Sequence, residues 1–123
     1  MMDKRRDGND DRAIATTVIG DVNGKDVFIF DDEVDTAGSL TETVTVLKKN
    51  GAKDIYFGCT HGVLSGPAIE RIKNSDIKEL VITDTVPLTK EKKLDKITVL
   101  SVAEMFGEVI RRNNEKHPIG ELF

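Results

Sequence analysis

Apolar positions along the chain alternate between short continuous runs and a helical spacing. The run Asp26–Phe30 is short and nearly all apolar, which is typical of a strand buried on both faces. Leu40, Val44 and Leu47 then recur at i, i+4 and i+7, the spacing of one face of a helix. Two lysines, an asparagine and a glycine at 48–51 predict where this helix ends.

The same alternation continues to the carboxyl end. Further strands are predicted at Asp54–Cys59, Glu79–Asp84 and Lys96–Ser101. Ser65 is a plausible cap for a short helix, and Ser101 with Glu104 predicts a capping box for the last helix. The apolar face of that last helix comprises Val102, Met105, Phe106, Val109 and Ile110. The pattern predicts a single three-layer α/β domain around a largely parallel sheet.

Composition excludes several classes of protein. A chain of 123 residues allows one domain, and a net charge of −4 argues against a general nucleic-acid or membrane-surface binder. Cys59 is the single cysteine, so a reducing compartment is expected, and its best interpretation is a small buried hydrophobe. No apolar run approaches the roughly 20 residues of a membrane span. We therefore expect a cytoplasmic protein without nucleic-acid or membrane partners.

The amino-terminal segment differs from the rest of the chain. Residues 1–13 are charged at nearly every position and have no apolar period, so an exposed or mobile segment is predicted. The chain is accordingly divided into a flexible charged segment, 1–17, and a folded domain, 18–123.

Polar clusters follow three predicted strands, where parallel sheets bind ligands. The turn Asp35–Ser39 is built from small residues and hydroxyls and opens a helix, so its backbone N–H groups can form an anion nest for a phosphate. An ordinary helix cap by Asp35 or Ser39 is an equally good interpretation of this turn alone. His61, in a second cluster, is expected to be a hydrogen-bonded structural residue.

Asp31 and Asp32 precede this turn directly. Paired carboxylates can bind Mg²⁺ or accept hydrogen bonds from sugar hydroxyls. A solvated acidic loop is the commoner explanation of such pairs, but here they adjoin the possible phosphate nest. Glu33 is expected to face solvent.

These residues resemble a known family. The stretch "DDEVDTAGSL" resembles the phosphoribosyl pyrophosphate signature that type I phosphoribosyltransferases and ribose-phosphate pyrophosphokinases share. The runs Thr60–Ala68, Thr83–Pro87 and Ser101–Phe123 resemble the pyrophosphokinases in particular. The resemblance implies a type I phosphoribosyltransferase-like fold. It also implies a Mg²⁺-dependent transfer of the β,γ-pyrophosphoryl group of ATP to ribose 5-phosphate, giving phosphoribosyl pyrophosphate.

The resemblance also implies roles for individual residues. The 5-phosphate would be held by Asp35, Thr36, Ala37, Gly38 and Ser39. Asp31 and Asp32 would bind the ribose hydroxyls, with Mg²⁺ nearby, and Lys4 and Arg6 match the Lys-x-Arg element of a flexible catalytic loop.

Two departures from the family are visible. The family's chains are about twice as long, and this sequence resembles their carboxyl-terminal half, so we expect it to be inactive alone and to self-associate or pair with an amino-terminal half. Pro118 and Gly120 stand where the family has serines of a phosphate and ADP regulatory site, which makes that regulation doubtful. A non-catalytic regulatory or assembly subunit is the alternative function. A small phosphoribosyltransferase would need a hood segment for which there is no room.

Overall fold

The computed structural model describes residues 2–5, 14–18 and 20–122. The strands are β1 (Met2–Arg5), β2 (Ile14–Val18), β3 (Val27–Val34), β4 (Ile55–Gly62), β5 (Glu79–Thr83) and β6 (Ile97–Leu100). The helices are α1 (Gly38–Lys49), α2 (Ala68–Asn74) and α3 (Ala103–Asn114), with short 3₁₀ turns at Lys90–Lys92 and Gly120–Leu122. Strands β3, β4, β5 and β6 form one parallel sheet in that order, and β1 and β2 form a separate antiparallel pair. The predicted α/β class and parallel sheet are confirmed.

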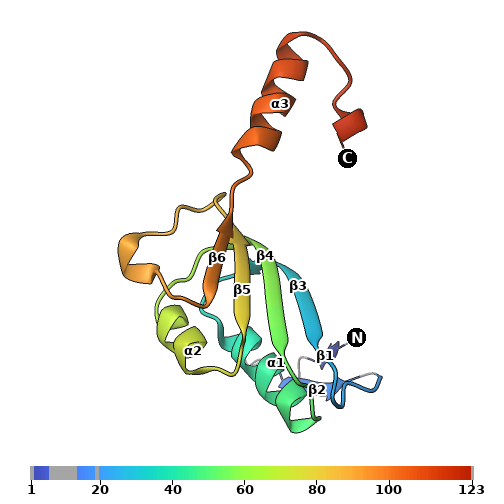
Figure 1. The fold of residues 1–123 in the computed structure, drawn as a ribbon, viewed down its shortest axis with the longest axis vertical. Helices are drawn as coiled ribbons and strands as arrows, with labels where there is room; N and C mark the ends of the chain where they lie inside the picture. Colours follow the sequence, from blue (N-terminus) through green and yellow to red (C-terminus); the bar gives the residue numbers. More distant parts are fainter. Residues whose placement is uncertain (1, 6–13, 19, 123) are drawn as a thin grey trace.

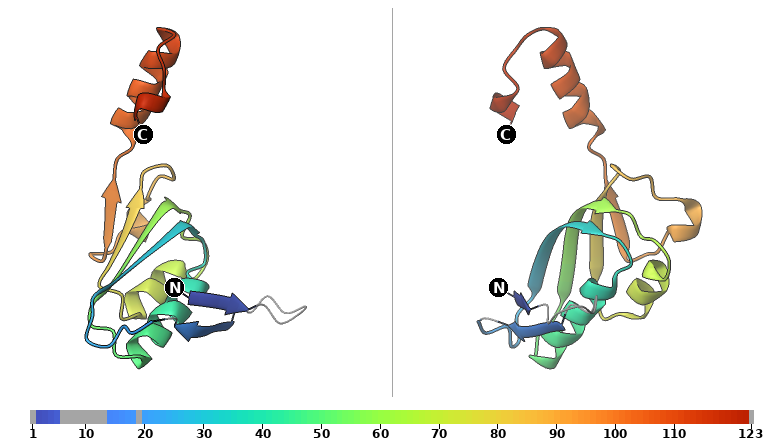
Figure 2. Two further views of the ribbon diagram at one scale, coloured as in Figure 1. Left: turned by 90° about the vertical axis from the view of Figure 1, so that its right-hand side faces the viewer. Right: turned by 180° about the vertical axis from the view of Figure 1, so that it is seen from behind.

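The core lies between this sheet and the two helices that cover one of its faces. Helices α1 and α2 lie on the same side of the sheet (Figures 1 and 2). Alternate side chains of the strands point to that side, and they are buried while their neighbours are not. The largest fully buried side chains are Ile55, Leu64, Ile72, Ile77, Leu80, Ile82 and Val44.

Strands β3 and β4 are longer than the apolar runs that predicted them. Strand β3 continues beyond Phe30 to Val34, so the acids Asp31 to Glu33 lie within the strand and not in a loop after it. Strand β4 likewise continues to Gly62. The reason is the parallel ladder, in which Asp31 pairs with Cys59 and Val34 with Gly62. Backbone pairing depends weakly on side-chain polarity, so the hydrophobic pattern ends earlier than the strands.

Helix ends were predicted with mixed success. Helix α1 ends at Lys49 with Asn50 as its C-cap, and Gly51 follows with φ of 83°, as the lysine–asparagine–glycine signal indicated. Helix α2 begins after Pro67 without a side-chain cap hydrogen bond, so the predicted Ser65 cap is wrong. Helix α3 begins after Val102, and the Ser101 hydroxyl accepts a hydrogen bond from the N–H of Ala103 at 3.2 Å. Ser101 therefore contacts this helix end as predicted, although Val102 and not Ser101 is the N-cap residue.

The third layer of the predicted domain is not formed by the residues that the structure describes. Helix α3 extends away from the sheet, and the face opposite α1 and α2 is uncovered (Figures 1 and 2). On this face Phe28 and Phe30 are 65% and 82% exposed, and no residue of α3 is buried. The apolar stripe of α3 predicted a helix correctly, but it does not pack on its own sheet.

The amino-terminal segment contains regular structure that its sequence did not predict. Lys4 lies on β1, which pairs with β2, whereas Arg6 lies outside the described residues. The mobile character of this segment, its catalytic role and the domain boundary at residue 18 stay predictions. Within the described part of the chain, no helix has the length and apolar character needed to cross a membrane.

Candidate functional site

A hollow of about 150 Å³ lies where β3 ends and α1 begins. Its lining comprises Asp31, Glu33, Val34, Asp35, Thr36, Ala37, Gly38, Ser39, Leu40 and Phe57. The structure therefore brings six of the predicted substrate-binding residues together around one small space. Asp32, the seventh, is not among the lining residues. Glu33 lies at the rim of the hollow and is exposed, as its sequence context predicted.

The start of α1 has the backbone conformation of an anion nest. Its N-cap is Ala37, which has the left-handed φ of 59° and makes no side-chain cap hydrogen bond. The first N–H groups of a helix have no acceptor within the helix, and a left-handed residue beside helical ones directs successive N–H groups into one concavity. An alanine in this conformation is strained by about 1–2 kcal/mol. The alternative of an ordinary cap by Asp35 or Ser39 is therefore wrong.

The loop after β4 clamps this turn from the neighbouring strand. The N–H groups of Leu64 and Ser65 donate to the carbonyls of Val34 and Asp35, each at 3.0 Å. The Ser65 hydroxyl also donates to the Asp35 carboxylate. Leu64 is fully buried and, like Ala37, has a positive φ, of 50°. Strained residues persist where surrounding contacts hold them, so the two loops define one rigid unit.

Arg71 of α2 places a cation beside this acidic loop. Its Nη1 donates to the carbonyl of Thr36 at 2.9 Å and lies 3.3 Å from the position that a Cβ on Gly38 would occupy. Sequence reasoning missed this residue. Nothing local marks it, because it is 35 positions from Thr36 and sits in an ordinary helical context.

The acids of β3 interact with one another. The backbone N–H of Glu33 donates to Oδ1 of Asp32 at 2.9 Å, and the N–H of Asp32 donates to Oδ1 of Asp31 at 3.0 Å. A hydrogen bond with the Asp31 side chain, and then the Glu33 N–H, lower the pKa of Asp32 below its usual range. Asp32 is thus held as a carboxylate, the form that a cation or a sugar hydroxyl would meet.

The described residues do not show a complete metal site. They contain no group of three or more His, Cys, Asp or Glu side chains arranged to hold a metal ion. Mg²⁺ commonly uses one or two carboxylates and keeps several waters. The Asp31–Asp32 pair fits that requirement in the chemistry of its donors.

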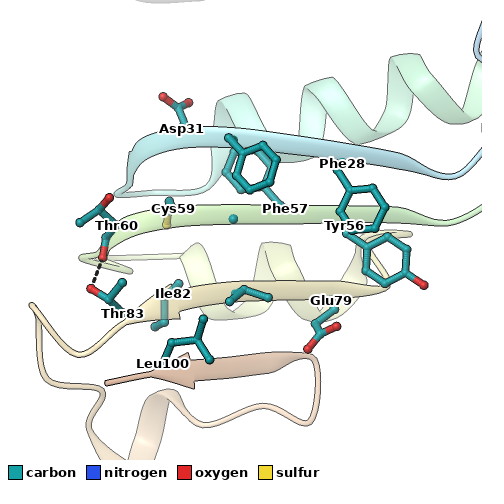
Figure 3. Close-up of a pocket in the computed structure, with 13 residues that line it drawn as sticks. Phe28, Asp31, Tyr56, Phe57, Cys59, Thr60, Glu79, Ile82, Thr83 and Leu100 are labelled. Carbon is teal, nitrogen blue, oxygen red and sulfur yellow. Dashed lines mark hydrogen bonds between the residues drawn. The ribbon is translucent and has the colours of Figure 1, made fainter. Parts of the chain in front are cut away.

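A hydroxyl cluster joins the carboxyl ends of β4 and β5. The Thr83 hydroxyl donates to the carbonyl of Thr60 at 2.7 Å, which is the dashed line in Figure 3. Nδ1 of His61 lies 2.9 Å from Oγ1 of Thr85, which also donates to the carbonyl of Thr60. The prediction of a hydrogen-bonded His61 is confirmed. Cys59 beside it is 7% exposed, and burial raises the pKa of its thiol to about 11, so it behaves as the predicted buried hydrophobe.

Together, the parallel sheet, the start of α1 and the acids before it define an α/β domain with a polar hollow at the carboxyl end of β3, where such sheets bind ligands. The model of the phosphoribosyl synthetase-associated domain matches residues 10–123, so the chain belongs to that family.

Individual relatives of this chain have names that match the family. The chain is 49% identical over its whole length to a ribose-phosphate pyrophosphokinase of Clostridium acetobutylicum and 52% identical to one of Caldanaerobacter subterraneus subsp. tengcongensis. It spans 38% and 39% of those proteins. A crystal structure of phosphoribosylpyrophosphate synthetase from Mycobacterium smegmatis superposes with a TM-score of 0.78 and 40% identity, over 80% of this chain and 33% of that one. The chain thus spans well under half of these relatives, and its assignment to their carboxyl-terminal half stays a prediction.

Proposed function

We propose that this chain is the ribose-5-phosphate-binding part of a ribose-phosphate pyrophosphokinase. The observation that carries the proposal is the left-handed start of α1 at Ala37 within the hollow of Asp31–Ser39, in a chain of the phosphoribosyl synthetase-associated family. Such proteins would transfer the pyrophosphoryl group of ATP to the C1 hydroxyl of ribose 5-phosphate. The Clostridium and Caldanaerobacter relatives support this reaction by their names.

Different residues around the hollow contact different parts of the sugar phosphate. The backbone N–H groups of Thr36 to Ser39 bind the 5-phosphate, and the hydroxyls of Thr36 and Ser39 add further donors. The carboxylate of Asp35 stays in place through its bond from Ser65 and closes the side of the nest. Arg71, bonded behind the loop to Thr36, offsets part of the negative charge that Asp31 to Asp35 would present to a phosphate.

Ahead of the nest, Asp31 and Asp32 would accept hydrogen bonds from the ribose hydroxyls and hold Mg²⁺ through water. Mg²⁺ would supply charge neutralisation for the phosphate oxygens during transfer. Lys4 and Arg6 would add cations against the transferring oxygens, since phosphoryl-type transfer depends mostly on positioning and charge stabilisation. The ATP-binding residues and the rest of the pentose site would come from the part of the longer relatives that this chain does not span.

Calorimetric titration with ribose 5-phosphate, in the presence and absence of MgCl₂, tests the proposal directly. Gly38→Val is the decisive variant because its side chain would crowd Arg71 and the nest. Gly38 has no positive φ, so the helix can still form. We expect at least a tenfold loss of affinity. Asp35→Ala should give a similar loss, because it removes the acceptor of the Ser65 hydroxyl.

Two controls make this titration specific. Asp95→Ala changes an exposed acid just before β6, at the opposite end of the sheet, and should leave the affinity unchanged. Ribose without phosphate should bind at least tenfold more weakly than ribose 5-phosphate. Equal binding of the two sugars, or unchanged affinity in Gly38→Val with normal circular dichroism, would refute the phosphate nest.

We further propose that the 123-residue chain alone does not synthesise phosphoribosyl pyrophosphate at a useful rate. A coupled assay for AMP release should give no signal above background at micromolar protein. Robust turnover would refute this proposal, because it would show that the chain contains all the residues that the reaction needs. Sequencing of the adjacent DNA would locate a missing half and decide its position relative to this chain.

A non-catalytic assembly subunit of the same family is the second candidate. The exposed aromatic face of the sheet favours it, because a surface of that kind commonly contacts another protein. The same titration separates the two functions, since a purely structural subunit need not bind ribose 5-phosphate.

A further inference from the structure

His61 lies near the carboxyl end of β4, and a β-bulge sets the direction of its side chain. The register of β4 with β5 shifts between Cys59 and His61, so Thr60 is the extra residue. A Cβ on the next residue, Gly62, would meet Ile82 in the core, and successive strand residues point to opposite faces. The imidazole therefore faces away from the helices that cover the sheet. Bulges are common next to binding sites, where they re-aim a side chain.

Two threonine hydroxyls beside the bulge fix the position of the hydrogen on the neutral imidazole. Nδ1 of His61 lies 2.9 Å from Oγ1 of Thr85. The Thr85 hydroxyl donates to the carbonyl of Thr60 at 3.0 Å, and the Thr83 hydroxyl donates either to that carbonyl at 2.7 Å or to Thr85 at 2.9 Å. Each hydroxyl has one hydrogen, so the number of hydrogen bonds is largest when Nδ1–H donates to Thr85. Nε2 is then the unprotonated nitrogen and an acceptor.

Nε2 of His61 is open to a ligand. It has no hydrogen-bond partner within residues 2–5, 14–18 and 20–122, and His61 is exposed. An unprotonated nitrogen does not bond a phosphate oxygen, because both atoms are acceptors. Mg²⁺ prefers oxygen ligands to nitrogen. The group that suits Nε2 is therefore a hydroxyl, which supplies a hydrogen.

The surroundings of His61 are continuous with the hollow at the start of α1. Asp31 lines that hollow and also a second one, of about 380 Å³, on the uncovered face of the sheet. Thr60 and Thr83 line the second hollow at the same end of their strands as Asp31 (Figure 3). The hydrogen bond with Asp31 lowers the pKa of Asp32 most, and the charge of His61 adds to the lowering, so this imidazole and this carboxylate lie within electrostatic reach.

We propose that His61 is a sugar-binding residue, whose Nε2 accepts a hydrogen bond from a ring hydroxyl of ribose 5-phosphate bound with its phosphate at Thr36–Ser39. The inference rests on the proposed ribose 5-phosphate site and adds to it a residue from the neighbouring strand. Thr85 is a positioning residue, since it accepts the Nδ1 hydrogen and leaves Nε2 for the ligand. The acids of β3 and His61 then contact hydroxyls from two adjacent strands, which favours a sugar phosphate over a simple phosphate monoester.

Calorimetric titration of the wild-type chain and of His61→Asn with ribose 5-phosphate is the first test. The Asn amide can donate to Thr85 but has no atom at the position of Nε2. We expect roughly a fivefold loss of affinity, which corresponds to one neutral hydrogen bond. Ethyl phosphate, which has a phosphate monoester and no sugar hydroxyl, should bind both chains with the same affinity in an NMR titration. His117→Asn, in the exposed segment after α3, is the matched control and should bind ribose 5-phosphate like the wild type.

The results distinguish a failure of this inference from a failure of the proposed function. Absence of ribose 5-phosphate binding by the wild-type chain would refute both. Binding by the wild type with unchanged affinity in His61→Asn would refute only the role of His61. An equal loss of affinity for ethyl phosphate would also refute that role, because the effect would then lie at the phosphate and not at the sugar.

The imidazole resonances test the hydrogen-bond arrangement itself. The chain has two histidines, so a ¹⁵N-labelled His117→Asn chain shows His61 alone. At about pH 8, where a free imidazole is neutral, we expect the hydrogen on Nδ1. Ribose 5-phosphate should shift the Nε2 resonance, and ethyl phosphate should not. Thr85→Val removes the acceptor of Nδ1–H, so it should mix the two tautomers and weaken ribose 5-phosphate binding about threefold. A hydrogen on Nε2 in the free chain, or an Nε2 resonance that ribose 5-phosphate leaves unchanged, would overturn the proposal.

Discussion

Gly62, the last residue of β4, is a position where the addition of one methyl group should destabilise the buried core. A Cβ built on Gly62 would lie 2.7 Å from Cδ1 of Ile82 and 3.1 Å from its Cγ2. Ile82 is completely buried on β5, beneath the helices. Gly62→Ala therefore adds a methyl group where the core is already filled.

The size of the effect follows from that contact. Overpacking a filled core by one methyl group typically costs about 1–3 kcal/mol, and the rigid setting of Ile82 places Gly62→Ala in the upper half of that range. Ile82→Val removes the atom nearest to the new methyl group and by itself costs about 0.5–1.5 kcal/mol. In the double variant the 2.7 Å clash is gone, although the Cγ2 contact remains tight. We expect a favourable coupling of about 1 kcal/mol between the two substitutions.

Equilibrium urea unfolding, followed by circular dichroism at one fixed protein concentration, measures this cycle. Gly107→Ala is the matched control, because a Cβ there meets no atom within 4 Å on an exposed helix. It should leave the unfolding free energy unchanged or raise it slightly through helix propensity. Strictly additive costs for Gly62→Ala and Ile82→Val would refute the argument, as would a Gly62→Ala variant within about 0.5 kcal/mol of the parent.

Three further predictions concern charges and the thiol. Arg71→Ala should weaken ribose 5-phosphate binding about five- to tenfold in calorimetry, since a charge-assisted bond to an exposed loop is worth about 1 kcal/mol. Lys73→Ala on the same helix should leave the affinity for ribose 5-phosphate unchanged. Equal losses in the two variants would show that the net positive charge of the helix, and not the Arg71 hydrogen bond, affects binding. Hydrogen bonds from Arg111 and Arg112 lower the pKa of Glu108 to about 2. Its stabilisation of α3 is thus complete above the ordinary glutamate pKa and is lost as the pH falls from about 4.5 towards 2. Helical circular dichroism should decrease in that window, and Glu108→Gln should abolish the Glu108 part of the decrease; an identical titration in the variant contradicts the assignment. Cys59 should react with a disulfide reagent at least tenfold more slowly in the native chain than in urea, because the raised pKa and burial keep it a protected thiol; similar rates would show that the strand opens readily.

The sequence alone determined those features whose causes lie close together along the chain. The nest needs small residues and hydroxyls in consecutive positions, so Asp35–Ser39 could be recognised from its own letters. The end of α1 at Asn50 and Gly51 was readable for the same reason, because capping is a local interaction. The order of strands and helices followed from hydrophobic periodicity, which reports which face of each element is buried.

Only the tertiary structure decided the partners of these local features. Ser65 had the sequence context of a helix cap, yet its hydroxyl bonds Asp35, 30 positions away, because the parallel pairing of β3 and β4 brings their loops together. Arg71 reaches Thr36 through the packing of α2 beside α1, which no local pattern encodes. Periodicity likewise predicted that α3 has an apolar side. What that side faces is set by the link between β6 and α3, where the Val102 N–H donates to Asp84, because a pattern specifies that a surface must be buried and never specifies against what.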